Sequence, residues 1–212
     1  MRYNVETPLH SHGASQMSAI DLSQFNFVVA VDKSSSMNKA DCRRGDQYIS
    51  RIAHVREQAV GLSYELADHD KDGISLAFFS SAITTYENVK ASEVEAKFPS
   101  RCSGSTDTTE AFQWIVDQSK GSTKPVIGLI ITDGEPDDKR SLEKAIKDAG
   151  DSAAPGSLKV VFIQVGHDAE STAHLATLND IRTKEDIIAV MTSAEADKFD
   201  SLHDLIDAAL AG

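Results

Sequence analysis

Short apolar runs and helix-spaced apolar residues alternate along this chain from about residue 25 to its end. Six segments have the hydrophobic pattern of β-strands, namely 25–32, 74–79, 83–89, 125–132, 158–165 and 187–191. Most of them are apolar at nearly every position, which is typical of strands buried on both faces of a parallel sheet. The segment 83–89 is polar at alternate positions and therefore predicts an edge strand.

Between these segments, apolar residues recur every three or four positions and predict amphipathic helices. The longest stripe consists of Ile52, Val55, Ala59, Leu62 and Leu66. Asp107 followed by Glu110 predicts a helix start. The last helix is expected to carry a stripe of Phe199, Leu202, Leu205, Ile206 and Ala209. This alternation predicts an α/β fold, a doubly wound, mostly parallel six-stranded sheet with helices on both faces.

Length and composition fit one globular domain. The chain has 212 residues, of which 41% are hydrophobic and 25% charged, so it is long enough to bury a full core. We expect a polar N-terminal tail over residues 1–22 and one domain over residues 23–212. No apolar run approaches the roughly 20 residues that span a bilayer, and no secretory signal is visible. A cytoplasmic location without membrane insertion is the default expectation.

Charge and cysteine content exclude several classes of function. The net charge is −12 and no stripe of Lys and Arg occurs, so a nucleic-acid partner is not expected. Cys42 and Cys102 lie outside any C-x-x-C pattern, and the seven histidines are scattered, so zinc-site spacing is absent. We expect two free thiols. A disulfide is the alternative, because both cysteines are expected in loops at the same end of the sheet.

The first strand ends in a cluster of oxygen donors. Asp32-x-Ser34-x-Ser36 offers one carboxylate and two hydroxyls on a short loop, at the sheet edge where open α/β folds place their ligands. Such donors suit a hard cation, Mg²⁺ or Mn²⁺, better than zinc or copper. The same residues also fit an ordinary turn in which a serine caps the next helix. Taken alone, this motif leaves both interpretations open.

The fourth strand also ends in a carboxylate, Asp133. In a sheet of order 3-2-1-4-5-6, strands one and four are neighbours at the switch point, so Asp32 and Asp133 are expected to face one crevice. The hydroxyl-rich loop 103–109 leads into the preceding helix and can reach the same crevice. Asp137 and Asp138 are expected mainly to solvate and cap the next helix. A second cation site and repulsion of acidic ligands are the alternatives for them.

Together these segments resemble the metal-ion-dependent adhesion site of von Willebrand factor A domains. The matching motifs are Asp32-x-Ser34-x-Ser36, Gly104-Ser105-Thr106-Asp107-Thr108 and Thr132-Asp133-Gly134. The similarity in strand and helix pattern extends from about residue 25 to residue 210, nearly the whole chain. The resemblance implies a Rossmann-like fold that binds Mg²⁺, or alternatively Mn²⁺ or Ca²⁺. Ser35 and Ser105 depart from the family, which often has glycine at these positions.

The resemblance also implies a role for each matching residue. Ser34 and Ser36 would coordinate the cation directly, and Thr106 would do so directly or through water. Asp32 and Asp133 would act mostly through bridging waters, which leaves the cation under-neutralised with one open position. An Asp or Glu of a partner protein would fill that position. The implied function is therefore protein binding without catalysis, and in relatives that regulate affinity the C-terminal helix slides along the sheet.

A magnesium-dependent hydrolase or phosphatase on a similar sheet is the alternative function. Enzymes that use an aspartyl nucleophile also place it at the end of strand one, but the related haloacid-dehalogenase-like enzymes need a second Asp where this chain has Ser34. No glycine-rich phosphate loop occurs. The serines lack a histidine partner in the sequence, although His54 or His167 could lie near them in space. These absences favour the binding module.

Overall fold

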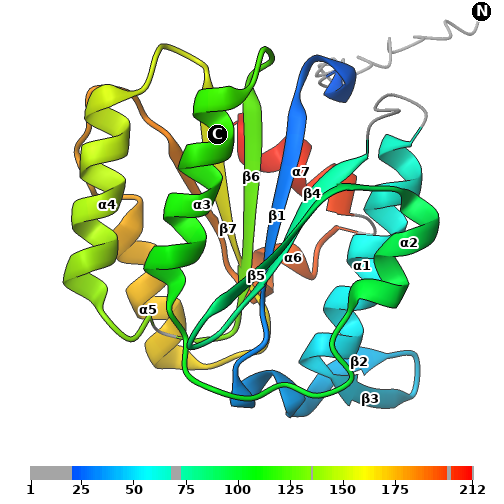
Figure 1. Cartoon of the computed structure of the whole chain (residues 1–212). Coiled ribbons are helices and arrows are strands. Elements are labelled where there is room, and N and C mark those ends of the chain that lie inside the picture. The colour runs from blue at the N-terminus through cyan, green and yellow to red at the C-terminus, as the bar shows by residue number, and fades with distance from the viewer. Residues whose placement is uncertain (1–20, 68–72, 135, 200–201, 212) are drawn as a thin grey trace, which may run out of the picture.

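Six strands form one twisted sheet in the computed structural model, which describes residues 21–67, 73–134, 136–199 and 202–211. They are β1 (Asn26–Asp32), β4 (Ile74–Phe79), β5 (Ile83–Val89), β6 (Val126–Thr132), β7 (Leu158–Gln164) and β8 (Ile188–Met191). Their spatial order, β5-β4-β1-β6-β7-β8, is 3-2-1-4-5-6 when the six are counted along the chain (Figure 1). Only β5 runs antiparallel, at the edge of the sheet. The expected strand order and edge strand are confirmed.

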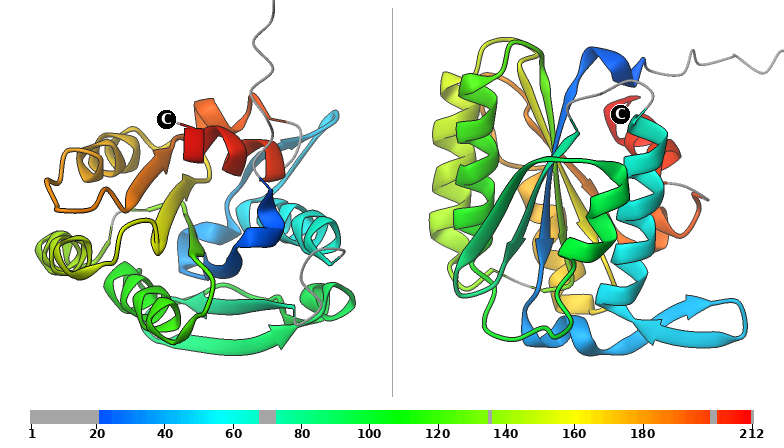
Figure 2. Two further views of the ribbon diagram at one scale, coloured as in Figure 1. Left: turned by 90° about the horizontal axis from the view of Figure 1, so that it is seen from above. Right: turned by 45° about the vertical axis from the view of Figure 1, so that its right-hand side comes forward.

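Helices cover both faces of the sheet (Figure 2). On one face pack α1 (Arg51–Leu66), α2 (Ala91–Lys97) and α7 (Leu202–Ala211), and on the other α3 (Thr108–Gly121), α4 (Lys139–Ser152) and α5 (Ala169–Leu178). The central strand shows why both faces are needed. Its Phe27, Val29 and Val31 enter the core beneath α1, while Val28 and Ala30 enter the core beneath α3. An apolar strand of this kind is stable only between two helical layers.

At the positions whose side chains are described, the two expected helix stripes are confirmed except at one residue. Four of the five residues predicted for α1 are buried, and Ile52 is partly buried against the same core. On the last helix, Leu205, Ile206 and Ala209 are buried. Phe199 was wrongly placed in this helix: it precedes the first helical residue, Leu202, and packs against the core from outside the helix. The prediction failed because Phe199 lies three residues before Leu202, so its position fits the helical period although it belongs to the preceding segment. The side chain of Leu202 lies outside the described residues.

A β-hairpin between the first strand and α1 was not predicted. It consists of β2 (Ala40–Arg44) and β3 (Gln47–Ser50), joined through a turn in which Gly45 has a φ of +57°. Three of the five residues of β2 are charged, and β3 is only four residues long, so the alternation that indicates a strand is weak. Cys42, which was expected in a loop, lies in β2.

Three shorter helical segments complete the described structure: η1 (Leu22–Gln24), η2 (Ser35–Asn38) and α6 (Ser193–Ala196). Of the N-terminal tail expected over residues 1–22, residues 1–20 lie outside the described residues, and Leu22 is buried in the core. Within the described ranges, no helix combines the length and hydropathy needed to cross a bilayer.

Candidate functional site

Backbone hydrogen bonds join the loop after β1 to the hydroxyl-rich loop before α3. The amide of Ser103 donates to the carbonyl of Lys33 at 2.8 Å, and the amide of Ser35 donates to the carbonyl of Gly104 at 3.2 Å. Gly104 has a φ of +95°, a conformation that favours glycine. Two segments almost seventy residues apart in the chain are therefore fixed side by side.

The loop after β6 is attached to the same hydroxyl-rich loop by Asp137. Both carboxylate oxygens of Asp137 accept from the amide of Thr106 at 3.1 Å, and the amide of Asp137 donates to the carbonyl of Thr106 at 3.0 Å. The expectation that Asp137 caps the next helix was therefore wrong. Asp138 alone has that role, because its side chain accepts from the amide of Ser141 in the first turn of α4.

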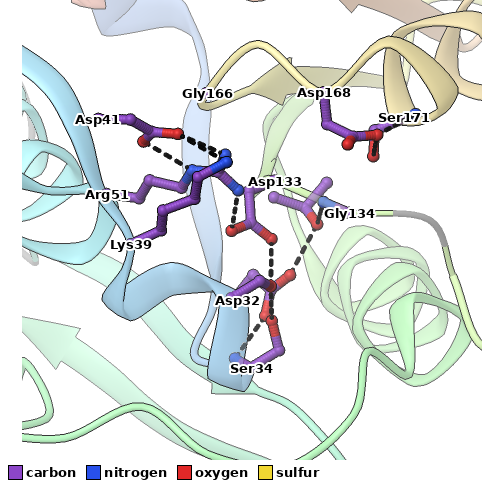
Figure 3. Close-up of polar contacts among 12 residues, drawn as sticks. Asp32, Ser34, Lys39, Asp41, Arg51, Asp133, Gly134, Gly166, Asp168 and Ser171 are labelled. Atoms are coloured by element: carbon purple, nitrogen blue, oxygen red, sulfur yellow. Dashed lines mark hydrogen bonds and ion pairs between the residues drawn. The ribbon is translucent and has the colours of Figure 1, made fainter.

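Four of the five residues implied as metal ligands are linked by direct hydrogen bonds (Figure 3). The hydroxyl oxygens of Ser34 and Ser36 lie 3.0 Å apart, and the Ser36 hydroxyl donates to Oδ1 of Asp133 at 2.7 Å. Oδ1 of Asp32 accepts from the amide of Ser34 at 2.6 Å. The expectation that Asp32 and Asp133 face one crevice is consistent with this arrangement.

Thr106 lies beside this group without being bonded to its side chains. Its hydroxyl oxygen is 3.9 Å from the point where a Cβ on Gly134 would stand, which places it next to the loop that follows Asp133. Thr106 is 8% exposed. Among the hydrogen bonds of the described residues, none joins the Thr106 hydroxyl to the other four side chains.

Asp32 lies completely inside the protein. Its second oxygen, Oδ2, accepts from the hydroxyl of Thr132 at 2.7 Å, and the side chain has no exposed surface. Burial raises the pKa of Asp32 to about 6, although the hydrogen bonds from Ser34 and Thr132 oppose this rise. Since burial penalises the charged form of a carboxylate, a cation next to Asp32 would relieve part of that cost.

The sequence did not reveal Arg51, which lies against Asp133. Nη1 of Arg51 donates to Oδ2 of Asp133 at 2.7 Å. Its Nε and Nη2 donate to the two oxygens of Asp41 at 2.9 and 2.7 Å. Hydrogen bonds to Asp41 and Asp133 raise the pKa of Arg51 above its ordinary value, and Arg51 in turn lowers the pKa of Asp41. A cation of the protein itself thus adjoins the candidate metal site.

A signal for Arg51 is present in the sequence. Arg51 stands four residues before Val55, so the helical period places it on the buried stripe of α1. Only 3% of its surface is exposed, and a buried arginine requires carboxylate partners. Which carboxylates serve as partners depended on the tertiary structure, since Asp133 is 82 residues away in the chain.

The donor set fits a small hard cation. Adjacent ligands of an octahedral Mg²⁺ at about 2.1 Å lie roughly 3 Å apart, close to the 3.0 and 2.7 Å that separate the oxygens of Ser34, Ser36 and Asp133. All five candidate donors are oxygens, and three are hydroxyls. Among the described residues, no group of three or more His, Cys, Asp or Glu side chains could hold a metal ion. A cation here would therefore depend on the hydroxyl groups.

The cysteines and histidines lie outside this cluster. Cys42 and Cys102 are free and buried, and burial raises the pKa of both thiols to about 11. His54 and His167 line a cavity of about 650 Å³ that extends from the hairpin to α6 and α7. In the described part of the chain, neither histidine hydrogen-bonds Ser34 or Ser36, and the nearest acidic group to His167 is Asp197, at 3.9 Å.

No family model matches the sequence, and no curated protein matches it. Several solved structures are similar. The PilB minor pilin from Streptococcus sanguinis is 15% identical with a TM-score of 0.58, over 87% of this chain and 62% of the pilin. The ArnB paralog VWA2 from Sulfolobus acidocaldarius is 22% identical with a TM-score of 0.54, over 84% of this chain and 43% of that protein.

A third similar structure is the manganese-loaded TRAP protein of Plasmodium vivax. It is 15% identical with a TM-score of 0.57, over 82% of this chain and 71% of that protein. This chain matches less than two thirds of the pilin and of VWA2. At these identities the likeness concerns the path of the backbone. This chain therefore has the α/β fold that these pilin, VWA and TRAP structures share.

Proposed function

We propose that this chain is a divalent-cation-dependent protein-binding module that engages an acidic residue of a partner protein through a bound metal ion. The observation that carries the proposal is the convergence of Ser34, Ser36 and Asp133. Their oxygens come from the ends of two neighbouring strands and lie at the mutual distances of adjacent metal ligands. The similar structures support an adhesive role, since they include a minor pilin, a pilus adhesin and a manganese-loaded protein.

Each residue of the cluster has a distinct part in this function. Ser34 and Ser36 would hold the cation directly, and Thr106 would bind it directly or through water. Asp32 and Asp133 would act through bridging waters in one state and by closer coordination in another, and they would supply negative charge. The bound cation, Mg²⁺ or alternatively Mn²⁺ or Ca²⁺, supplies an open coordination position for a carboxylate of the partner. The protein's own contribution is a rigid set of loops that keeps these oxygens in place.

The alternative, a magnesium-dependent hydrolase or phosphatase, finds less support. Both oxygens of Asp32 accept hydrogen bonds and the side chain is fully buried, so it is poorly presented as a nucleophile. Release of nitrophenol from p-nitrophenyl phosphate distinguishes the two functions. A binding module leaves this substrate intact with Mg²⁺ present, whereas turnover that is lost in Asp32→Asn would establish the enzyme.

The cytoplasmic location expected from the sequence stays a prediction.

The test of the proposed function is the thermal stability of metal-stripped protein with and without added cation. At a concentration one hundred times its dissociation constant, a bound ion stabilises the native state by about 2.7 kcal/mol. For a domain of this size that corresponds to a rise of roughly 5–10 °C in Tm. Mg²⁺ and Mn²⁺ should both produce the rise in the wild type.

The variant that tests the site is Ser34→Ala/Ser36→Ala, in which we expect no rise. A matched control is Ser119→Ala/Ser152→Ala, two serines in α3 and α4 that donate to backbone carbonyls within their own helices. It should respond to cation as the wild type does. An unchanged Tm in the wild type, or an equal rise in Ser34→Ala/Ser36→Ala, would refute a metal site at this cluster.

A further inference from the structure

The two carboxylate oxygens of Asp133 have different hydrogen-bond partners, and Arg51 binds only one of them. Its Nη1 donates to Oδ2 at 2.7 Å, while Oδ1 accepts from Ser36 and faces the candidate cation position. In Figure 3 the guanidinium lies on the side of Asp133 away from Ser34, toward the hairpin. The guanidinium therefore does not occupy the proposed cation position. The carboxylate of Asp133 lies between the guanidinium and that position.

The surroundings of Arg51 keep it in this position. Its Nε and Nη2 bind both oxygens of Asp41 on β2, and 4% of its side chain is exposed. Gly166 closes the far side, because a Cβ there would stand 2.4 Å from Nε and 2.5 Å from Cζ. Lys39 and Asp168 are further charged groups nearby, the former 3.4 Å from Asp41. Arg51 is thus a fixed charge, held from three sides.

A fixed positive charge beside Asp133 changes the affinity of the cluster for a cation. A guanidinium bonded to one oxygen of a carboxylate opposes the attraction that the carboxylate exerts on a cation at its other oxygen. Asp41 offsets part of the guanidinium charge, but Arg51 lies between Asp41 and the cluster. Arg51 is therefore expected to weaken cation binding, and Asp41 is expected to strengthen it by acting on Arg51.

Resting on the proposed function, we propose that Arg51 sets the cation affinity of this cluster and makes it dependent on the carboxylate of the partner. Without a partner, the cluster holds its cation weakly, because Arg51 offsets the charge of Asp133. An Asp or Glu of the partner supplies the missing negative charge. Arg51 is a positioning residue, because it acts through Asp133 and does not touch the cation.

The experiment measures the dissociation constant of Mn²⁺ by calorimetry in the full chain. In Arg51→Gln we expect roughly tenfold tighter binding, because a nearby positive charge is removed. In Asp41→Asn we expect binding weakened roughly threefold, because the charge of Arg51 is less compensated. Arg51→Lys keeps the positive charge but not the bidentate contact with Asp41, and it should bind Mn²⁺ more weakly than Arg51→Gln does. The matched control is Arg56→Gln, at an exposed arginine on the same helix, which should not change the affinity.

Opposite shifts in Arg51→Gln and Asp41→Asn support the proposal, since a merely structural role would weaken binding in both. Shifts in the same direction, or no shift, overturn it. Removing one partner of a buried ion pair can prevent folding. If circular dichroism shows Arg51→Gln to be unfolded, Asp41→Asn decides: weaker binding supports the proposal, and unchanged or tighter binding overturns it. A wild type that binds no Mn²⁺ would instead refute the proposed function.

Discussion

At the scale of single residues, the loops of the candidate site depend on a glycine that accepts an unusual backbone conformation. Gly104 has a positive φ, and a Cβ there would lie 2.9 Å from Oγ of Ser81 and 3.1 Å from Oγ of Ser80. Its carbonyl also accepts from Ser35. At Gly104 the hydroxyl-rich loop thus packs closely against the turn that follows β4 and against the loop that follows β1.

We predict that Gly104→Ala lowers the free energy of unfolding by roughly 1–3 kcal/mol, because the new methyl group meets both strain and close contacts. Urea denaturation measures the change. Gly61→Ala is the matched control, because Gly61 lies inside α1 with nothing within 4 Å of a built Cβ. It should stabilise the protein by about 1 kcal/mol. Equal effects of the two substitutions would show that the conformation of Gly104 is unimportant.

The two cysteines provide a prediction about pH at the same scale. Burial raises the pKa of both thiols to about 11, so they stay protonated at neutral pH and the reactive thiolate is scarce. At pH 8 the native protein should react with iodoacetamide at least about tenfold more slowly than the protein in guanidinium chloride, where burial is lost. The native rate should rise as the pH approaches 11. Rapid labelling of native protein at pH 8 would contradict the burial of these thiols.

At the scale of elements, α3 approaches the sheet closely because β6 has a glycine beneath it. A Cβ on Gly128 would lie 2.4 Å from Cγ2 of Ile115. Gly128 pairs with Val28 of β1 and Val160 of β7 in the middle of the sheet. This contact allows α3 to lie close to β6, the strand that ends just before Asp133. The first residue of α3, Thr108, lies within the hydroxyl-rich loop 103–109.

We predict that Gly128→Ala destabilises the protein by about 1–3 kcal/mol through overpacking. Ile115→Leu moves the branch away from Cβ and should relieve part of this cost. The double variant Gly128→Ala/Ile115→Leu is then expected to be more stable than the sum of the single changes indicates. Thermal unfolding of the four proteins gives the coupling. Additive effects would mean that α3 shifts away from the sheet freely.

At the scale of the whole molecule, the chain carries 33 acidic and 21 basic residues. Part of any stabilisation by salt is therefore general screening of self-repulsion, with no binding site involved. The candidate site adds a specific contribution for divalent cations. The two effects differ in their dependence on the identity of the ion.

We predict that NaCl and MgCl₂ at equal ionic strength raise the Tm of Ser34→Ala/Ser36→Ala to a similar extent, since only screening remains. In the wild type MgCl₂ should exceed NaCl by the 5–10 °C expected of a filled site. Differential scanning calorimetry measures both. If the two salts were equivalent in the wild type, the response to Mg²⁺ would be a property of net charge alone.

The sequence by itself predicted the six strands of the main sheet and the candidate donor set. Runs such as Phe27 to Val31 are apolar on both faces, which indicates a strand between two helical layers. With such strands alternating with helices, the doubly wound order is the one expected from general rules for parallel sheets. If that order holds, Asp32 and Asp133 are expected at one crevice, because neighbouring parallel strands bring their carboxyl ends together.

Only the tertiary structure decided how the charges around that donor set are paired. The strand that carries Asp41, β2, is charged at three of its five positions and so lacks a clear strand pattern. Asp137 was expected to cap a helix, but its carboxylate accepts from the amide of Thr106. Arg51 stands on the buried stripe of α1, yet its link to Asp133 joins residues 82 positions apart. Hydrophobic periodicity reports which residues are buried. It does not report which buried charges meet, because that depends on long-range contacts with no local pattern.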